Sequence, residues 1–235
     1  MFFTGKMKKM IAMAGVLAIG AMLVSGCGGE KSAGGSGGEL SGKITASGST
    51  ALLPLLKPAQ EEFQTKHGKV TVNIAGGGSF TGMNQVAGGS VQIGDSDVNL
   101  PAEYQDKGLV DHKVVVEPFV FITNKDNKVD NLTKDQVVGI LTGQLTNWKQ
   151  VGGADLPITL VHRAKSSGSR ATIAEVVLQG KEFTDQAVIQ DSNGAVRTAV
   201  SSTPGAIGYV DAPYADDSVK LLAYNGVKYT AAAII

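Results

Sequence analysis

From residue 43 onward, short hydrophobic runs alternate along the chain with stretches in which apolar residues recur at helical spacing. Strands are predicted at residues 44–46, 70–74, 91–94, 114–122, 156–161 and 205–210, and helices at residues 52–63, 80–87, 133–141, 171–178 and 194–201. Regular alternation of the two patterns is typical of an α/β fold, because each helix can return the chain to the next strand of a sheet. Ser49 or Thr50 is the expected N-cap of the first helix.

The N-terminus has the pattern of an export signal. Three lysines precede an uncharged stretch at residues 10–24, which is short for a bilayer span and lies where a secretory signal has its apolar region. Residues 24–27, Val-Ser-Gly-Cys, resemble the bacterial lipoprotein box, in which the cysteine becomes the acylated first residue. We predict a lipoprotein signal peptide at residues 1–26 and lipidation of Cys27, the alternative being a free buried thiol.

The segment after this cysteine is a predicted tether. Residues 27–42 are rich in glycine and serine and poor in apolar residues, which favours a flexible linker. One acyl chain binds membranes only marginally, and bacterial lipoproteins generally carry several. We therefore expect a lipid-anchored protein on the cell membrane that faces away from the cytoplasm.

Composition narrows the classes of function. The 235 residues are 43% hydrophobic and 18% charged, as in a globular protein. The 21 basic and 21 acidic residues cancel, so no excess charge is present to neutralise a nucleic-acid backbone. A single cysteine excludes an internal disulfide, and the separated His67, His112 and His162 do not have metal-ligand spacing. We expect no nucleic acid, metal or cofactor, and we place the histidines at the surface or in turns.

Three loops share small hydroxyl residues and glycines immediately before predicted helices. They cover residues 47–50, 76–79 and 166–169. Helix N-termini present unpaired N–H groups and a partial positive charge, while glycine permits close approach and hydroxyls add neutral donors. A single such loop is usually an ordinary cap or turn. Three of them pointing into one cleft would bind an oxyanion.

Charged residues next to these loops suggest which anion is bound. Arg163 directly precedes the third loop, and a guanidinium fits two oxygens of a tetrahedral anion, although a surface position is the alternative. Asp95 and Asp97 end a predicted strand, where α/β folds place ligands; helix capping or a turn is the alternative. Phosphate near neutral pH keeps a proton that a carboxylate can accept, whereas sulfate has none. An aspartate in the site would therefore select phosphate by rejecting sulfate.

Motifs for catalysis are incomplete. Residues 77–82 have the glycine spacing of a P-loop, but Met83 and Asn84 stand where Lys and Ser/Thr are required. Thr81 replaces the last glycine of a nucleophile elbow around Ser79. A secreted phosphatase or serine hydrolase would need a base beside its serine, and no histidine lies near these loops in the sequence. We therefore predict no catalytic residues.

Several ordered motifs together resemble one family, the phosphate-binding lipoproteins of phosphate ABC transporters, often called PstS. They are Gly48-Ser49-Thr50, Gly77-Gly78-Ser79-Phe80-Thr81-Gly82, residues 91–97, Arg163 with residues 164–170, and Gly205-Ala206-Ile207-Gly208-Tyr209. The resemblance implies that phosphate is bound by Thr50, Ala51, Ser79, Asp97, Arg163, Ser167, Gly168 and Ser169. Asp95 departs from the small residue often found at its position, which leaves open whether it contributes beside Asp97.

The resemblance also implies a fold and a partner. We expect a monomer of the two-lobed periplasmic-binding-protein type (type II), with a ligand cleft between two α/β lobes and delivery of phosphate to ABC transporter permease subunits. Lobe one is expected at residues 43–117 plus 200–235, and lobe two at residues 118–199. Relatives usually continue for tens of residues beyond the region of residues 224–229, so we expect a truncated C-terminus. Binding of sulfate or molybdate, and a structural or adhesive role, are the alternatives.

Overall fold

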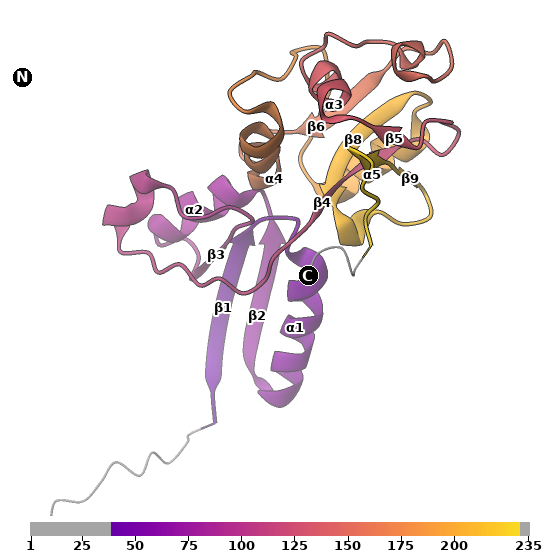
Figure 1. Cartoon of the computed structure of the whole chain (residues 1–235). Helices are drawn as coiled ribbons and strands as arrows, with labels where there is room; N and C mark the ends of the chain where they lie inside the picture. Colours follow the sequence, from indigo (N-terminus) through magenta and orange to yellow (C-terminus); the bar gives the residue numbers. More distant parts are fainter. Residues whose placement is uncertain (1–38, 231–235) are drawn as a thin grey trace, which may run out of the picture. The chain divides into compact units, whose positions relative to one another are not determined.

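The computed structural model describes residues 39–230, which form a three-stranded, a five-stranded and a two-stranded sheet together with helices (Figure 1). This mixed α/β architecture confirms the predicted fold class. The signal peptide, Cys27 and nearly all of the predicted tether lie outside the described residues. Within residues 39–230, no helix combines the length and apolar character needed to cross a membrane.

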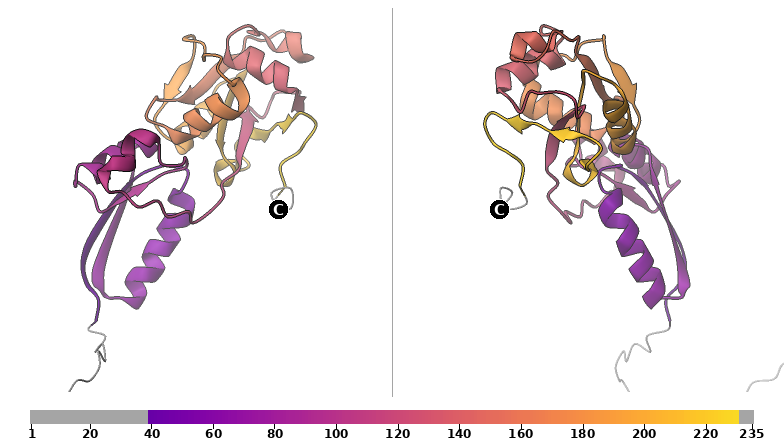
Figure 2. Two further views of the ribbon diagram at one scale, coloured as in Figure 1. Left: turned by 60° about the vertical axis from the view of Figure 1, so that its left-hand side comes forward. Right: turned by 90° about the vertical axis from the view of Figure 1, so that its right-hand side faces the viewer.

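The first sheet carries three of the loops that matter for binding. Its strands are β1 (Ser41–Gly48), β2 (Lys69–Gly76) and β3 (Ile93–Asp95), in the order β2-β1-β3 and all parallel. Helices α1 (Leu53–Lys66) and α2 (Ser79–Ala87) connect them, and α1 runs alongside β2 (Figure 1, Figure 2). Because parallel strands end at the same edge, the three following loops lie together.

Two details of this sheet differ from the sequence prediction. β1 begins at Ser41, inside the predicted tether, because Ser41 and Gly42 pair with Lys69 and Val70 of β2. The N-cap of α1 is Leu52, which makes no side-chain cap bond, so neither Ser49 nor Thr50 caps this helix. Both hydroxyl residues stay in the loop beyond the strand.

The crossing between the sheets is only partly a strand. The 3-10 helix η1 (Ala102–Lys107) is followed by residues 108–118 without regular structure, and β4 spans Phe119–Thr123. The predicted strand at 114–122 is therefore wrong in its first half. Val114 and Val116 are exposed, and no strand among the described residues pairs with them, so β propensity alone does not order this stretch.

The second sheet has the strand order β7-β6-β8-β4-β9. β6 (Thr159–Arg163), β7 (Val188–Gln190) and β8 (Ala206–Asp211) are mutually parallel, whereas β4 and β9 (Lys220–Leu221) form antiparallel pairs. The remaining elements are β5 (Asn131–Leu132), α3 (Lys134–Leu141), η2 (Trp148–Val151), α4 (Gly168–Ile173), the π-helix η3 (Ala174–Leu178), α5 (Asn193–Ser202), η4 (Ala212–Tyr214) and β10 (Ala223–Tyr224).

Two hydrophobic clusters stabilise this second sheet. One contains Trp148, Leu160 and Tyr209, and the other contains Ile122 and Val196 from β4 and α5. Thr133 caps α3 in a capping box with Gln136. Most of the apolar packing among the described residues thus belongs to the five-stranded sheet.

The predicted division of lobe one differs from the structure at the C-terminal end. β8 pairs with β4 on one side and β6 on the other, and β9 also pairs with β4. Residues 200–230 therefore belong to the second sheet, because a strand between two neighbours of that sheet cannot lie in the first. We use lobe one for residues 39–117 and lobe two for residues 118–230.

Candidate anion-binding site

The three loops at the carboxyl edge of the first sheet contact one another through their backbones. Gly78 N donates to Gly48 O at 2.8 Å, and Ser49 N donates to Asp95 O at 2.8 Å. A Cβ atom at Gly48 would overlap the Asp95 carbonyl, and Gly48 has a φ of 149°, so glycine is required there. Two of the three loops predicted from their composition, residues 47–50 and 76–79, are thus assembled at one place with the loop after β3.

The Asp97 carboxylate lies at the centre of these loops and bridges the two lobes. Ser79 Oγ of lobe one donates to Asp97 Oδ1, and Ser169 Oγ of lobe two donates to Oδ2 at 2.7 Å. The Asp97 N–H in turn donates to Ser79 Oγ at 3.2 Å. Gly168 lies against the same carboxylate, since a Cβ atom there would overlap Asp97 Oδ1. Three predicted site residues, Ser79, Gly168 and Ser169, therefore meet at the carboxylate of a fourth, Asp97.

Neighbouring contacts hold the loop of lobe two against lobe one. Phe80 N donates to Ser166 O at 3.1 Å, directly after Ser79. Ser167 caps α4, where its Oγ accepts a bond from Arg170 N at 3.3 Å. These contacts place the predicted residues Ser167, Gly168 and Ser169 at the boundary between the lobes, with the Ser167 hydroxyl engaged in capping.

Arg163 ends β6 at this boundary, and its guanidinium is buried with only 1% of the residue exposed. Nη2 donates to Asp191 O at 2.9 Å and Nε to Gln190 O at 3.3 Å, but Nη1 has no hydrogen-bond partner within residues 39–230. Burial lowers the pKa of the guanidinium, while the nearby Asp97 raises it. A buried cation with a free donor is costly unless an anion meets it.

Thr50 and Ala51 lie on the same edge of lobe one but use their polar atoms differently. Thr50 Oγ1 accepts bonds from Asn193 N at 3.2 Å and from Asn193 Nδ2 at 3.1 Å. Tyr214 Oη donates to Thr50 O at 2.5 Å. Ala51 N donates to Ser49 Oγ at 3.1 Å, so an anion would have to replace this local bond to use that N–H.

Asp95 lies apart from these contacts. Its side chain lines a cavity of about 620 Å³ in lobe one with Leu52, Met83 and residues 108–112, and its Oδ2 has no partner among the described residues. Burial raises its pKa to about 6. Asp97, rather than Asp95, is thus the acid that meets the loops of lobe two.

Asp95 gives a prediction about stability. An acid whose pKa is raised on folding favours the folded state while it is protonated, and this contribution is lost as the pH rises from about 4 to about 6. Asp95→Asn should therefore raise the free energy of unfolding at pH 7.5, by roughly 1 to 2 kcal/mol, and change it little at pH 4. Urea titrations at both pH values measure this difference.

The control is the exposed carboxylate of Asp106, also in lobe one. Asp106→Asn should leave the urea midpoint at both pH values close to that of the wild type. Equal stabilisation by Asp95→Asn at pH 4 and 7.5 would show that the buried charge is not the cause.

The structure also brings in residues that the sequence analysis missed. Burial raises the pKa of Glu117 to about 8, with Asp211 and Asp97 adding to the effect. Burial also raises the pKa of Asp211 to about 7, and Asp97 adds to it. Asp211 ends β8, which is parallel to β6, so the strand-end rule that indicated Asp97 could have indicated Asp211. Asn193 and Tyr214 carry no such sequence signal.

The prediction that His162 lies at the surface or in a turn is wrong. His162 lies within β6, is 1% exposed and stacks on Phe183 with ring centroids 4.6 Å apart. Burial lowers its pKa to about 4, which keeps the imidazole neutral in the interior. Within residues 39–230, no group of His, Cys, Asp and Glu side chains is arranged to hold a metal ion.

Comparisons with curated proteins identify relatives of this chain. The phosphate-binding protein PstS of Bacillus subtilis (strain 168) is 42% identical over 191 residues, which cover 80% of this chain and 63% of that protein. PstS of Borreliella burgdorferi is 29% identical over 184 residues, covering 75% of this chain and 66% of that protein. The chain thus spans slightly less than two thirds of the length of these two relatives.

Solved structures give the same grouping. A putative phosphate ABC transporter substrate-binding protein from Clostridium perfringens, with bound phosphate, has a TM-score of 0.79 and 34% identity, covering 82% of this chain and 80% of that one. An ABC-type phosphate transport receptor from Vibrio cholerae has a TM-score of 0.63 and 29% identity, with coverage of 82% and 81%. The family model of the PBP superfamily domain matches residues 33–233. The resemblance to PstS proteins is therefore confirmed, and the chain belongs to the PBP superfamily.

Proposed function

We propose that this protein captures inorganic phosphate and delivers it to the permease subunits of an ABC transporter. The observation that carries the proposal is the buried Arg163, whose Nη1 has no partner within residues 39–230 and which lies near Asp97. A buried guanidinium beside hydroxyls and a carboxylate suits an oxyanion that also carries a proton. The names of the relatives, which include phosphate-binding proteins, support the same ligand.

The carboxylate supplies the selectivity. Asp97 can accept a hydrogen bond from the proton that phosphate keeps near neutral pH, whereas a sulfate oxygen would face it with no donor between them. An unsatisfied buried acceptor costs about 1 to 3 kcal/mol or more, so sulfate is rejected, whereas phosphate gains a hydrogen bond. The raised pKa values of Glu117 and Asp211 limit further negative charge around the anion.

The proposed ligand shell draws on both lobes. Arg163 donates from Nη1, and the hydroxyls of Ser79 and Ser169 turn from Asp97 toward the anion. The other proposed ligands are the Thr50 hydroxyl, the Ala51 N–H, and Ser167 and Gly168 at the start of α4. Apart from the acceptor Asp97, every one of these groups is a donor, which suits binding of an oxyanion that carries a proton.

The proposed location follows from the N-terminal pattern. A lipid on Cys27 and the Gly/Ser-rich tether would hold a monomer at the cell membrane on its outer side, where it meets the permease. Labelling of cells with radioactive palmitate tests the anchor. The Cys27→Ala variant should carry no label and should be released into the medium. A variant that keeps the label would contradict lipidation of Cys27.

Asp97→Asn tests the proposed function. The amide replaces an acceptor by a donor, so affinity for phosphate should fall roughly tenfold to hundredfold, and sulfate should become a competitor. Isothermal titration of the wild type and the variant with phosphate, arsenate and sulfate measures the change. Arsenate should follow phosphate, because it also carries a proton.

Asp95→Asn is the matched control, since Asp95 is two residues away but lines the cavity in lobe one and makes no side-chain hydrogen bond to lobe two like that of Asp97. It should keep the wild-type preference for phosphate over sulfate. If Asp97→Asn discriminates between the two anions as well as the wild type does, the proton-acceptor role is wrong. Binding of sulfate or molybdate, but not phosphate, by the wild type would overturn the function itself, as would turnover of a chromogenic phosphate ester well above the blank.

A further inference from the structure

The hydroxyl of Thr50 has both of its acceptor positions filled from lobe two. A threonine hydroxyl has two acceptor lone pairs and one donor proton. Asn193 fills both acceptor positions, through its backbone N–H at 3.2 Å and its side-chain Nδ2 at 3.1 Å. The remaining proton of Thr50 must therefore point away from Asn193.

The orientation of the Asn193 amide is fixed by a second contact. Its Oδ1 accepts a bond from Asp211 N at 3.0 Å, which leaves Nδ2 to face Thr50. The Asn193 side chain is fully buried, at 0% exposure. Because the oxygen is already used by a backbone donor, the amide cannot rotate without losing bonds at both ends.

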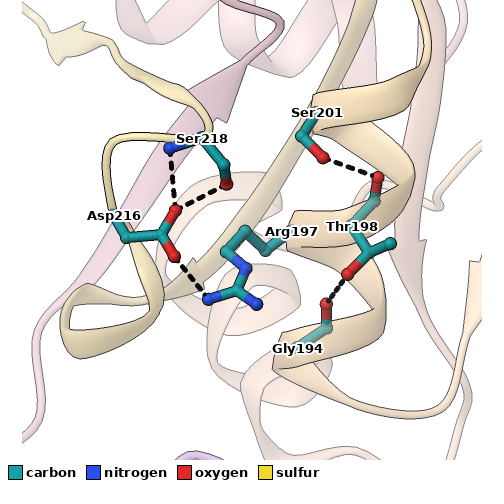
Figure 3. A network of polar contacts seen from close by, with 6 residues as sticks. All are labelled: Gly194, Arg197, Thr198, Ser201, Asp216 and Ser218. Carbon is teal, nitrogen blue, oxygen red and sulfur yellow. Dashed lines mark hydrogen bonds and ion pairs between the residues drawn. The ribbon is translucent and has the colours of Figure 1, made fainter.

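Helix α5, which begins at Asn193, is itself held in place. Ser192 caps it by accepting a bond from Ala195 N at 3.0 Å. Arg197, one turn further on, pairs with Asp216 at 2.6 Å, and Asp216 also accepts bonds from Ser218 (Figure 3). Asn193 is thus presented to lobe one by a fixed helix and not by a free loop.

A second group from lobe two contacts the same residue. Tyr214 Oη donates to the Thr50 carbonyl at 2.5 Å, so both the backbone and the side chain of Thr50 are bonded across the lobe boundary. These bonds exist only when lobe two lies against the loop after β1. The direction of the Thr50 proton therefore depends on contact between the lobes.

We propose that Asn193 is a positioning residue for anion binding: it fills the acceptor positions of Thr50 and so aims the Thr50 proton at the bound oxyanion. This inference rests on the proposed function, because it takes Thr50 as a phosphate ligand. Asn193 does not touch the anion. It makes the donation by Thr50 conditional on closure of the lobes, which links capture of the ligand to the closed arrangement.

A double-mutant cycle on phosphate affinity tests the proposal. Thr50→Val removes the hydroxyl at nearly constant shape and should weaken phosphate binding roughly tenfold or more. Asn193→Ala should weaken it about fivefold to tenfold, because the Thr50 proton is no longer directed. In the Thr50→Val background, the same Asn193→Ala change should have less than about a twofold further effect. Isothermal titration with phosphate measures all four proteins.

Asn124→Ala is the matched control. Asn124 is also a buried asparagine, and its Nδ2 donates to Val200 O and Ser201 O at the other end of α5. This variant should lower the melting temperature without changing phosphate affinity. If it weakens binding as much as Asn193→Ala does, disturbance of α5 explains the effect and the positioning role is overturned.

The cycle separates failure of this inference from failure of the proposed function. If Thr50→Val leaves phosphate affinity unchanged, Thr50 is not a phosphate ligand, and the proposed function fails in its assignment of Thr50. If Thr50→Val weakens binding but Asn193→Ala does not, or if the two effects add fully, Asn193 does not act through Thr50.

Should Asn193→Ala not fold, Asn193→Asp replaces it with a side chain of the same shape. Its carboxylate still accepts from Asp211 N, but it draws the Thr50 proton toward itself, so phosphate affinity should fall at least as far as in Thr50→Val. Unchanged affinity in this variant would also overturn the proposal.

Discussion

Arg163→Met should weaken phosphate binding about 100-fold or more, the largest loss expected from any single side chain of the proposed site. Among the residues that the structure describes, the guanidinium has no partner for its Nη1 donor, and it is buried with only 1% of the residue exposed. Hydrogen bonds between charged groups in such surroundings contribute about 1.5 to 3 kcal/mol each, and a fork can make two of them. Titration calorimetry with phosphate measures the change.

Two further variants separate charge, geometry and folding. Arg163→Lys keeps the charge but cannot form a planar fork, so its affinity should lie between those of the wild type and Arg163→Met. Arg197→Met removes an arginine of lobe two that pairs with Asp216 at the surface, and it should bind phosphate like the wild type (Figure 3). A folded Arg163→Met protein with an unchanged dissociation constant would remove Arg163 from the site.

The part of the site that the sequence predicted is the part governed by local rules. Strands β1, β2 and β3 are parallel, so the loops that follow them had to meet at one edge, where Asp97 N donates to Ser79 Oγ. The same rule places Arg163 at the end of β6. Glycines and hydroxyls before helices are visible in the sequence because each acts on its own neighbouring backbone.

The residues that were missed act across long distances in the sequence. Asn193 reaches Thr50 over 143 positions, and Tyr214 reaches it over 164. No periodicity or spacing indicates such a pair, because it depends on how the two lobes meet. The predicted assignment of residues 200–230 to lobe one differs from the structure for a similar reason. The partners β4 and β6 decide which sheet β8 joins, and the residue pattern of β8 itself does not.

Burial was the other property that the sequence did not reveal. His162 looks like a polar residue next to a loop, yet it packs against Phe183 inside lobe two. Val114 and Val116 show the opposite difference between expectation and structure. They have high β propensity but lie exposed without a partner strand among the described residues. In both cases the neighbouring chain, not the residue type, determines the environment.

The second large effect is expected from Gly168→Ala, through steric exclusion instead of a lost charge. A Cβ atom at position 168 would overlap Asp97 Oδ1 and lie 2.5 Å from Ser79 Oγ. These two atoms belong to lobe one and Gly168 belongs to lobe two, so the added methyl group prevents the lobes from meeting at Asp97. Phosphate affinity should fall about tenfold to hundredfold, since both overpacking and the loss of inter-lobe bonds oppose closure.

The melting temperatures of Gly168→Ala with and without phosphate show whether the added methyl group hinders closure of the lobes. Alanine is a better helix residue than glycine, and position 168 begins α4, so the ligand-free variant should melt at or near the wild-type temperature. Phosphate should raise that temperature much less than in the wild type, because the closed form is disfavoured. Gly68→Ala is the control, since a Cβ atom there meets nothing within 4 Å. If Gly168→Ala instead bound phosphate like the wild type, the close approach of Gly168 to Asp97 would not be a feature of the ligand-bound state.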